Sequence, residues 1–494
     1  MSHDTTTDHT TVTNPTGLAI PSLTALVVGS MIGGGIFGLP SQMARAAALG
    51  PLLIGWALTG VGMLMLAFTY QSLANRYPEV NGGVYGYARA GFGNFIGYCS
   101  AIGYWIGAWI GNVAFLVLLG SAIGTFIPSF VGGNTLPSIA FTSVILWVVH
   151  ALVLRGVQEA AVVNVIVTVA KVVPLVTFVV VGIFAFRFDF LTADIWGTAT
   201  QVYADGGTEL LPLGGTMSQV VAMMLITVWV FSGVEGAAVF SERARRRSDV
   251  GKATVIGFLF VLALYMLINI MSYGIMSQTD VSGLADPSLA GVFAEAVGPW
   301  GAGFISIGLI VSLLGVLLSW VLLATEILRV PAEEGVMPRS FGRVNDRGTP
   351  PVALWTSNIA AQVTLILTYF SSSTYEFLIF LASGTILIPY LWSALFQLKT
   401  AWRGERITQG KSVTYERVVG LVAVLYTIWL MYAGRDYILP SAAVYLVLVP
   451  LYVKARREVG EAKAFTPFEL VVLAALAAMT VAFAVQLATG TSAF

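Results

Sequence analysis

The chain has 494 residues, of which 57% are hydrophobic and only 10% are charged, whereas ordinary soluble domains carry about 25% charged residues. This composition, with a mean hydropathy of +0.84, excludes a chain of soluble domains and predicts an all-α polytopic membrane protein. The 25 basic and 25 acidic residues cancel, so the charge gives no sign of a nucleic-acid partner, and the lipid bilayer is the expected environment.

The start of the chain and its cysteine content add two expectations. Residues 1–17 are rich in threonine and lack Lys and Arg, which predicts a disordered tail before the first span. The single cysteine, Cys99, excludes an intrachain disulfide and lies in an apolar run, which favours a buried packing role. The sequence shows no nucleotide loop, metal-ligand cluster or hydrolytic triad, so we expect no cofactor, no metal site and no enzymatic activity.

Thirteen apolar runs are long enough to cross a bilayer, and thirteen is the predicted number of spans. The runs lie near residues 18–40, 51–70, 94–120, 136–154, 160–186, 216–240, 252–276, 299–329, 352–370, 375–398, 415–433, 437–453 and 467–489.

The distribution of Lys and Arg predicts the orientation of these spans, because cytoplasmic loops are enriched in both residues. Loops after even-numbered spans contain nearly all of the 25, whereas loops after odd-numbered spans contain only Arg45, Arg187 and Arg435. We therefore expect the amino terminus in the cytoplasm and the carboxyl terminus outside. Twelve spans is the alternative, if residues 415–453 form one crossing and one re-entrant segment.

Two spans contain a break in their helix-forming pattern. Gly29–Phe37 (GSMIGGGIF) has three consecutive glycines in the first span, and Trp229–Gly236 (WVFSGVEG) interrupts the sixth. In lipid, non-helical backbone is tolerated only inside protein or beside a watery cavity, so two breaks predict a binding site at mid-membrane depth. Close packing of helices at small residues is the alternative.

The five-span separation of the two breaks predicts a pair of inverted five-helix repeats. We expect residues 18–186 to form the first repeat and residues 216–398 the second, so that residues 18–398 make a ten-helix transport core. Residues 415–489 would then supply additional transmembrane helices.

The breaks supply backbone groups that suit a free amino acid. Unwinding at Gly33, Gly34 and Gly35 would free N–H donors beside a helix amino terminus, which suits a carboxylate. The carbonyl groups of Met31 and Ser232 would suit an ammonium group. The breaks therefore favour a carrier of amino acids or amines.

Two ionisable residues lie inside spans, where a charge is costly and marks a functional candidate. Glu235 adjoins the second break and is expected to act in gating or proton coupling; a structural carboxylate is the alternative. Lys171, in the fifth span, is expected to take the place of a bound sodium ion or to titrate as a proton-linked switch; a structural ion pair is the alternative.

Further candidates for substrate contact lie in spans three, six and eight. Trp229 and Trp320 are inside spans rather than at their ends, which suits stacking on a cation, although core packing explains either residue equally well. Gly107, Ala108 and Asn112 would leave a space lined by small residues with one amide, and helix packing is again the alternative.

Six motifs stand out along the chain: Gly29–Pro40 (GSMIGGGIFGLP), Tyr77–Tyr87 (YPEVNGGVYGY), Tyr104–Asn112 (YWIGAWIGN), Leu146–Glu159 (LWVVHALVLRGVQE), Val228–Gly236 (VWVFSGVEG) and Glu334–Pro351 (EGVMPRSFGRVNDRGTPP). In this order they resemble the amino acid–polyamine–organocation superfamily, and within it the basic amino acid antiporters. The first and fourth motifs are most similar to arginine–ornithine antiporters and related lysine permeases.

This resemblance implies a LeuT-type fold of five plus five inverted helices with additional carboxyl-terminal spans, working by alternating access. It implies that the backbone of Gly33 to Gly35 binds the substrate carboxylate, and that carbonyl groups of spans one and six bind its amine. The substrate side chain would stack on Trp229 and Trp320, with its cationic end near Gly107, Ala108 and Asn112.

The resemblance also implies a role in gating or proton coupling for Glu235 and a sodium-site position for Lys171. Arginine–agmatine exchangers lack that lysine, and the thirteenth span exceeds the usual twelve, so the exchange partner stays open. The expected function is sodium-independent exchange of cationic amino acids, arginine for ornithine, at the plasma membrane. A lysine permease driven by the proton gradient or the membrane potential is the alternative. The sequence assigns no oligomeric state.

Overall fold

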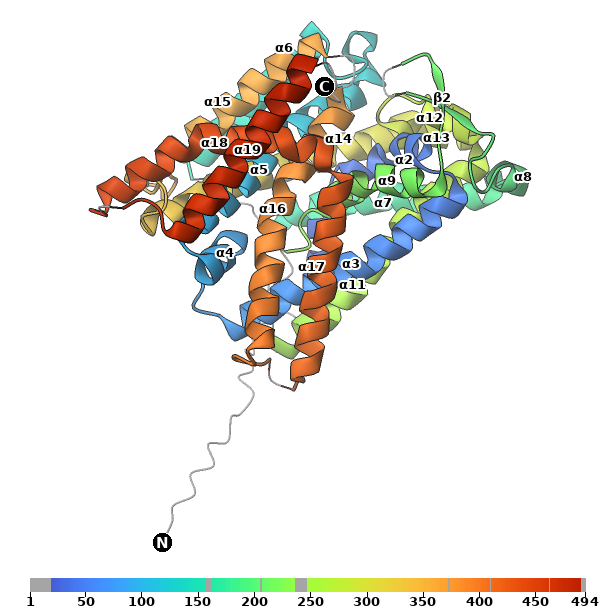
Figure 1. The fold of residues 1–494 in the computed structure, drawn as a ribbon. Coiled ribbons are helices and arrows are strands. Elements are labelled where there is room, and N and C mark those ends of the chain that lie inside the picture. Colours follow the sequence, from blue (N-terminus) through green and yellow to red (C-terminus); the bar gives the residue numbers. More distant parts are fainter. Residues whose placement is uncertain are drawn as a thin grey trace.

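The computed structural model describes residues 19–156, 161–204, 207–235, 247–371, 374–408, 410–461 and 463–489. These residues fold almost entirely into helices (Figure 1). The predicted disordered tail, residues 1–17, lies outside the described ranges.

The first part of the chain contains α1 (Ile20–Met31), η1 (Gly35–Phe37), α2 (Leu39–Ala46), α3 (Leu49–Arg76), α4 (Val84–Phe92), α5 (Asn94–Gly124), η2 (Pro128–Phe130), α6 (Leu136–Leu154), α7 (Ala161–Ala185) and α8 (Phe188–Thr192). The middle part contains β1 (Gln201–Tyr203), β2 (Leu210–Pro212), α9 (Thr216–Phe231), α11 (Arg247–Ile275), α12 (Gln278–Ser282), α13 (Ser288–Val297) and α14 (Trp300–Glu333). The last part contains η4 (Arg339–Phe341), α15 (Pro351–Leu367), η5 (Thr368–Phe370), α16 (Thr374–Trp402), α17 (Val413–Ala433), α18 (Arg435–Glu458) and α19 (Pro467–Thr489).

Helices occupy all thirteen predicted span positions, which confirms the prediction of an all-α polytopic membrane protein. Within the described ranges, 11 helices are long and apolar enough to cross a membrane. The first and sixth predicted spans instead hold the shorter helices α1, of 12 residues, and α9, of 16 residues, because both spans are interrupted. The choice between twelve and thirteen crossings and the inverted repeat stay predictions.

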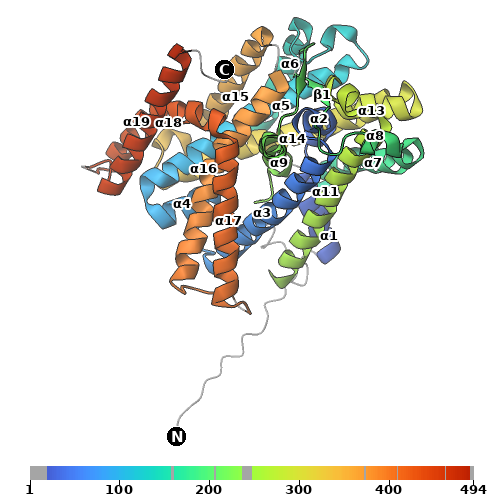
Figure 2. The ribbon, with the colours of Figure 1, turned by 45° about the vertical axis from the view of Figure 1, so that its right-hand side comes forward.

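Helix α5 is the central element of the bundle. In its most apolar window 89% of the residues are buried, and α14 and α16 pack along its length. Cys99 lies on this helix and is only 4% exposed, which confirms its predicted buried position. At the opposite extreme, α19 is largely exposed, with only Glu469 and Leu476 of its residues buried, and it lies at the edge of the bundle beside α18 (Figures 1 and 2).

Several short elements lie in segments that the sequence analysis treated as loops. Helix α4 connects α3 to α5, and helices α12 and α13 lie between α11 and α14 and pack against α2. Strands β1 and β2 form an antiparallel hairpin in which Val202 pairs with Leu211. These elements are too short to give a spanning signal, and they cover the ends of the long helices.

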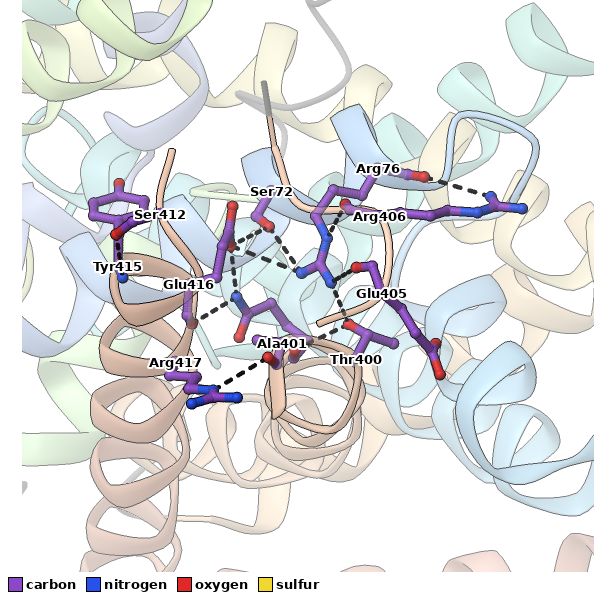
Figure 3. A network of polar contacts seen from close by, with 11 residues as sticks. Ser72, Arg76, Thr400, Ala401, Glu405, Arg406, Ser412, Tyr415, Glu416 and Arg417 are labelled. Carbon is purple, nitrogen blue, oxygen red and sulfur yellow. Dashed lines mark hydrogen bonds and ion pairs between the residues drawn. The ribbon is translucent and has the colours of Figure 1, made fainter. Parts of the chain in front are cut away.

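A buried polar network joins the end of α3 to the start of α17 (Figure 3). Arg76 is 4% exposed and Glu416 is fully buried, and their charged groups lie 3.7 Å apart. Ser72 and Gln397 also donate hydrogen bonds to the Glu416 carboxylate, at 2.7 and 2.9 Å. Arg76 donates further to Thr400 at 2.9 Å and to two backbone carbonyl groups of the α16–α17 loop. The network therefore fixes the start of α17 against α3 and α16.

We expect Glu416→Ala to lower the apparent free energy of unfolding by about 3–5 kcal/mol, because Arg76 would stay buried without its carboxylate. Thermal unfolding of the purified protein in lipid nanodiscs measures this loss. Arg76→Met combined with Glu416→Leu should recover most of it, since both charges are then removed. Glu79→Gln is the matched control, because the Glu79–Arg406 pair is more than half exposed and should not change the unfolding temperature. Wild-type stability in Glu416→Ala would contradict the expectation.

Candidate functional site

The first helical break lies between α1 and α2. Helix α1 ends at Met31, residues 32–34 are not helical, and a single 3-10 turn follows before α2 begins at Leu39. The glycines weaken the helix and Pro40, near the start of α2, favours a new first turn. The backbone N–H groups of Gly33, Gly34 and Gly35 donate to no acceptor in the described part of the chain. The break therefore presents free N–H donors, as the sequence predicts.

The second break follows α9 and lies directly against the first. Helix α9 ends at Phe231, and Gly233 takes a φ of +104°, which favours glycine. A Cβ atom at Gly233 would lie 2.6 Å from the carbonyl oxygen of Ser30, so only glycine allows this approach of the two segments. The carbonyl oxygen of Ser232 accepts no hydrogen bond from the described residues. The two interrupted spans thus meet at their breaks.

Tyr265, on α11, holds the two breaks together. Its hydroxyl lies 3.0 Å from the carbonyl oxygen of Met31 and 3.0 Å from that of Val230, so one proton is shared between α1 and α9. The Met31 carbonyl, predicted to bind a substrate amine, therefore already has one donor, although a carbonyl oxygen can accept two. The sequence analysis missed Tyr265, because the sequence of an apolar span does not show which acceptors a tyrosine hydroxyl will reach.

Aromatic rings line the region beside the glycines. Phe115, on α5, lies between the two predicted tryptophans, with its ring centroid 5.3 Å from Trp229 and 6.0 Å from Trp320. Trp229 packs on Gly35 so closely that a Cβ there would lie 2.6 Å from its indole nitrogen. We call Phe115, Trp229 and Trp320 the aromatic box. Phe115 is the member that the sequence did not single out.

The three glycines of the first break have different surroundings. A Cβ atom at Gly34 would lie 2.6 Å from the Leu313 side chain, so Gly34 serves close packing. A Cβ atom at Gly33 would meet nothing within 4 Å. The open space beside the free N–H donors therefore lies at Gly33.

The candidate residues of α5 also separate into packing and polar positions. Gly107 faces α16, where a Cβ atom would lie 2.5 Å from Ile386, and Ala108 is fully buried. Asn112 is 1% exposed, and neither its amide nitrogen nor its amide oxygen has a hydrogen-bond partner among the described residues. A buried amide without partners costs free energy, so Asn112 is the member of this set with hydrogen-bonding groups left open among the described residues. Substrate contact at Gly107 and Ala108 stays a prediction.

Glu235 links the second break to helices α5 and α16. Tyr104 donates a hydrogen bond to one carboxylate oxygen, and Tyr390 donates to the other at 2.7 Å. The backbone N–H of Gly233 approaches the same oxygen as Tyr390 at 3.2 Å. The carboxylate therefore ties the second break to α5 and α16.

Lys171, on α7, donates to the carbonyl end of α1. It is 4% exposed, and its Nζ lies 2.8 Å from the carbonyl oxygens of both Gly29 and Ile32. The break deprives these carbonyl groups of helical partners, and such oxygens are also ligands for a hard cation. The ammonium group therefore satisfies two carbonyl oxygens beside the break. Its predicted replacement of a sodium ion stays a prediction.

The chain belongs to the amino acid permease family, whose model matches residues 18–453. It is 50% identical over 467 residues to a Pseudomonas aeruginosa protein named arginine/ornithine antiporter, covering 93% of this chain and 95% of that protein. It is 38% identical to an L-lysine transport protein of Corynebacterium glutamicum, covering 96% and 95% of the two chains. It is also 38% identical to an arginine/agmatine antiporter of Chlamydia abortus, covering 90% and 91%.

A solved transporter has the same fold despite a very different sequence. The crystal structure of a manganese transporter from Eremococcus coleocola superposes with a TM-score of 0.57 at 12% identity, covering 94% of this chain and 93% of the transporter. The relation at this identity concerns the fold alone. Together with the family match, it makes this chain a membrane transporter of the amino acid permease family.

Gly33 and Gly35 have opposite surroundings, one open and one tightly packed, and substitutions at these two positions test the site. We expect Gly35→Ala to lower the apparent free energy of unfolding by about 1–3 kcal/mol, because the new methyl group overlaps Trp229. Gly33→Ala should leave the unfolding temperature unchanged, yet weaken amino acid binding by about tenfold, because its methyl group enters the open space beside the N–H donors.

Thermal unfolding and equilibrium binding of radiolabelled arginine measure the two effects on the same preparations. Normal binding in Gly33→Ala would mean that the substrate lies elsewhere.

Proposed function

We propose that this protein exchanges cationic amino acids across the plasma membrane by alternating access, most simply arginine for ornithine. Its amino terminus would lie in the cytoplasm, and residues 18–398 would form the transport core of two inverted repeats. The observation that carries the proposal is that the N–H donors of Gly33 to Gly35 and the amide of Asn112 have no hydrogen-bond partner among the described residues. The relatives named as arginine antiporters and as a lysine transport protein support the substrate class.

The backbone groups at the breaks suit the main-chain end of an amino acid. An α-carboxylate can accept hydrogen bonds from the free N–H groups at the amino-terminal end of η1 and α2. An α-ammonium group can donate to the carbonyl oxygen of Ser232, which has no donor in the described ranges. Both charges of the substrate are then matched by backbone groups.

The aromatic box and Asn112 suit the cationic side chain. A guanidinium or ammonium group stacks favourably on the faces of Trp229 and Trp320, and Phe115 fills the space between them. The amide oxygen of Asn112 can accept a hydrogen bond from the same group. Because the amide is neutral, arginine and ornithine can replace each other without leaving a buried charge unpaired.

Lys171 and Glu235 supply two fixed ionisable groups for the conformational cycle. With the Lys171 ammonium at the carbonyl end of α1, no sodium ion is needed to satisfy Gly29 and Ile32. Glu235, held by Tyr104 and Tyr390, is suited to gating. The same two groups favour the alternative of a proton-coupled lysine permease, since either could titrate during transport.

Counterflow in proteoliposomes tests the proposal. Radiolabelled arginine should enter vesicles preloaded with ornithine and should not enter empty vesicles, because obligate exchange needs a substrate on both sides. Replacing sodium with choline should not change the rate. Internal citrulline, which lacks the positive charge, is the matched control. Uptake into empty vesicles driven by an imposed proton gradient or potential would favour the permease instead.

Glu235→Gln tests the gating role. The amide keeps the size of the side chain but cannot hold a negative charge, so we expect the exchange rate to fall by at least about tenfold, or ~1.4 kcal/mol on the barrier, with little change in KM. Initial exchange rates at several arginine concentrations and pH values measure both constants. Asp189→Asn, at an exposed site, controls for loss of a carboxylate. An unchanged rate in Glu235→Gln would exclude the role.

A further inference from the structure

One face of α18 changes from apolar to basic toward the end of the helix. Four exposed residues form a single stripe on this face, because they follow one another at helical spacings of three or four residues: Val447, Pro450, Lys454 and Arg457. The stripe is about 15 Å long, since each helical residue adds ~1.5 Å. The distribution of Lys and Arg along the chain predicts that its basic end lies at the cytoplasmic surface of the membrane.

The surface along this stripe is hollowed. An open groove of about 590 Å³ lies beside the end of α18. Its lining is apolar toward the middle of the helix and charged toward its end: Val449, Pro450, Val453, Lys454, Arg457 and Glu458. A phospholipid has the same order of groups, because its acyl chains lie deeper in the membrane than its headgroup.

The two basic residues of the groove are not paired with a carboxylate. Neither Lys454 nor Arg457 forms an ion pair with another residue that the structure describes, whereas the neighbouring Arg456 is paired with Glu461 at 2.8 Å. A carboxylate oxygen of Glu458 accepts the backbone N–H of the η4 segment at 2.8 Å. Two cations and one carboxylate therefore line the groove, which leaves it with a net positive charge.

A second open groove extends the positive surface beyond α18. It has a volume of about 530 Å³ and begins at Val459, directly after the helix. Its two carboxylates, Glu333 and Glu334, are in ion pairs with arginines of α14 and α4. Arg339 and Arg343 also line it, and within the described ranges neither forms an ion pair. An anionic headgroup in the first groove would therefore meet a second basic region beside it.

The opposite side of α18 is held firmly by the bundle. The ring of Tyr452 lies 5.2 Å from that of Phe95, on α5, and 5.4 Å from that of Phe465. The guanidinium group of Arg456 donates to the carbonyl oxygen of Gly335 at 3.3 Å. The helix end that carries the groove is thus fixed in place, so little ordering of the protein is needed when a ligand binds.

An anionic phospholipid matches the groove in both shape and charge. Phosphate oxygens accept strong hydrogen bonds from ammonium and guanidinium groups, and an acyl chain can lie along the apolar wall. Basic pockets at the cytoplasmic surface of a membrane protein suit anionic headgroups. We propose that the groove at the end of α18 binds an anionic phospholipid of the cytoplasmic leaflet, with the phosphate between Lys454 and Arg457 and an acyl chain on Val449 and Val453. This binding does not depend on which amino acid the protein transports.

Lipid binding to the purified protein tests the site. The full chain in a neutral detergent is titrated with fluorescent phosphatidylglycerol and, separately, with phosphatidylcholine that has the same acyl chains. Phosphatidylglycerol should bind about tenfold more tightly, and Lys454→Gln combined with Arg457→Gln should remove most of this preference, because each basic residue near an anionic headgroup strengthens binding by roughly fivefold. Arg403→Gln combined with Lys411→Gln removes the same charge from exposed positions of the α16–α17 loop and should bind both lipids as the wild type does.

Val453→Asn tests the apolar wall of the groove. The polar side chain should weaken phosphatidylglycerol binding several-fold, since it disfavours contact with an acyl chain. Because Val453 is only partly buried, the unfolding temperature measured without added lipid should stay the same. Soluble glycerol phosphate should not displace the lipid, because it carries the phosphate but no chain.

Equal affinity of the wild type for the two lipids would overturn the site. It would also be overturned by undiminished phosphatidylglycerol binding in the Lys454→Gln, Arg457→Gln variant, or by an equal loss in the loop control. Displacement of the lipid by glycerol phosphate at similar concentrations would show that a free phosphate, and not a phospholipid, is the ligand.

Discussion

A lipid bilayer offers no hydrogen bonds to the backbone, and this constraint governs how the two interrupted helices are built. Side chains of the protein satisfy several carbonyl groups at the two breaks: Lys171 donates to two at the first break, and Tyr265 donates to one from each interrupted span. The N–H groups on the other side of the break have no such partners among the described residues. Among the described residues, the N–H groups of the first break and the carbonyl oxygen of Ser232 at the second are therefore left open, which favours a ligand that carries both an anionic and a cationic group.

Helix α5 connects the groups around the two breaks to the rest of the bundle. It contributes Tyr104 to the Glu235 carboxylate and Gly111, where a Cβ atom would lie 3.3 Å from Trp229. It also carries Asn112, whose amide has no partner among the described residues. It also packs against α14 and α16, which bear Trp320 and Tyr390. One long buried helix thus sets the relative positions of the aromatic box, the polar amide and the carboxylate. A shift of α5 would change all three together.

The sequence was sufficient to predict the helical class, the positions of the spans and both breaks, because hydrophobic length and consecutive glycines are local signals. It singled out Trp229, Asn112, Glu235 and Lys171 for the same reason, since polar or aromatic groups inside a span stand out, and their roles stay predictions. It could not identify Tyr265 or Phe115. Their roles depend on which atoms of distant segments lie opposite them, and a tyrosine or phenylalanine in an apolar run is indistinguishable from ordinary core. The short helices α4, α12 and α13 were missed because their apolar faces are too short to resemble a span.

The burial of Cys99 has a practical consequence. The chain contains one cysteine, and its side chain on α5 is buried. We therefore expect the native protein not to react with thiol reagents. A cysteine placed at an accessible position would then be the sole reactive thiol, without prior removal of a native one. Spectroscopic labels can therefore be attached one at a time, and the separation of α2 from α16 can be followed in the otherwise unaltered sequence.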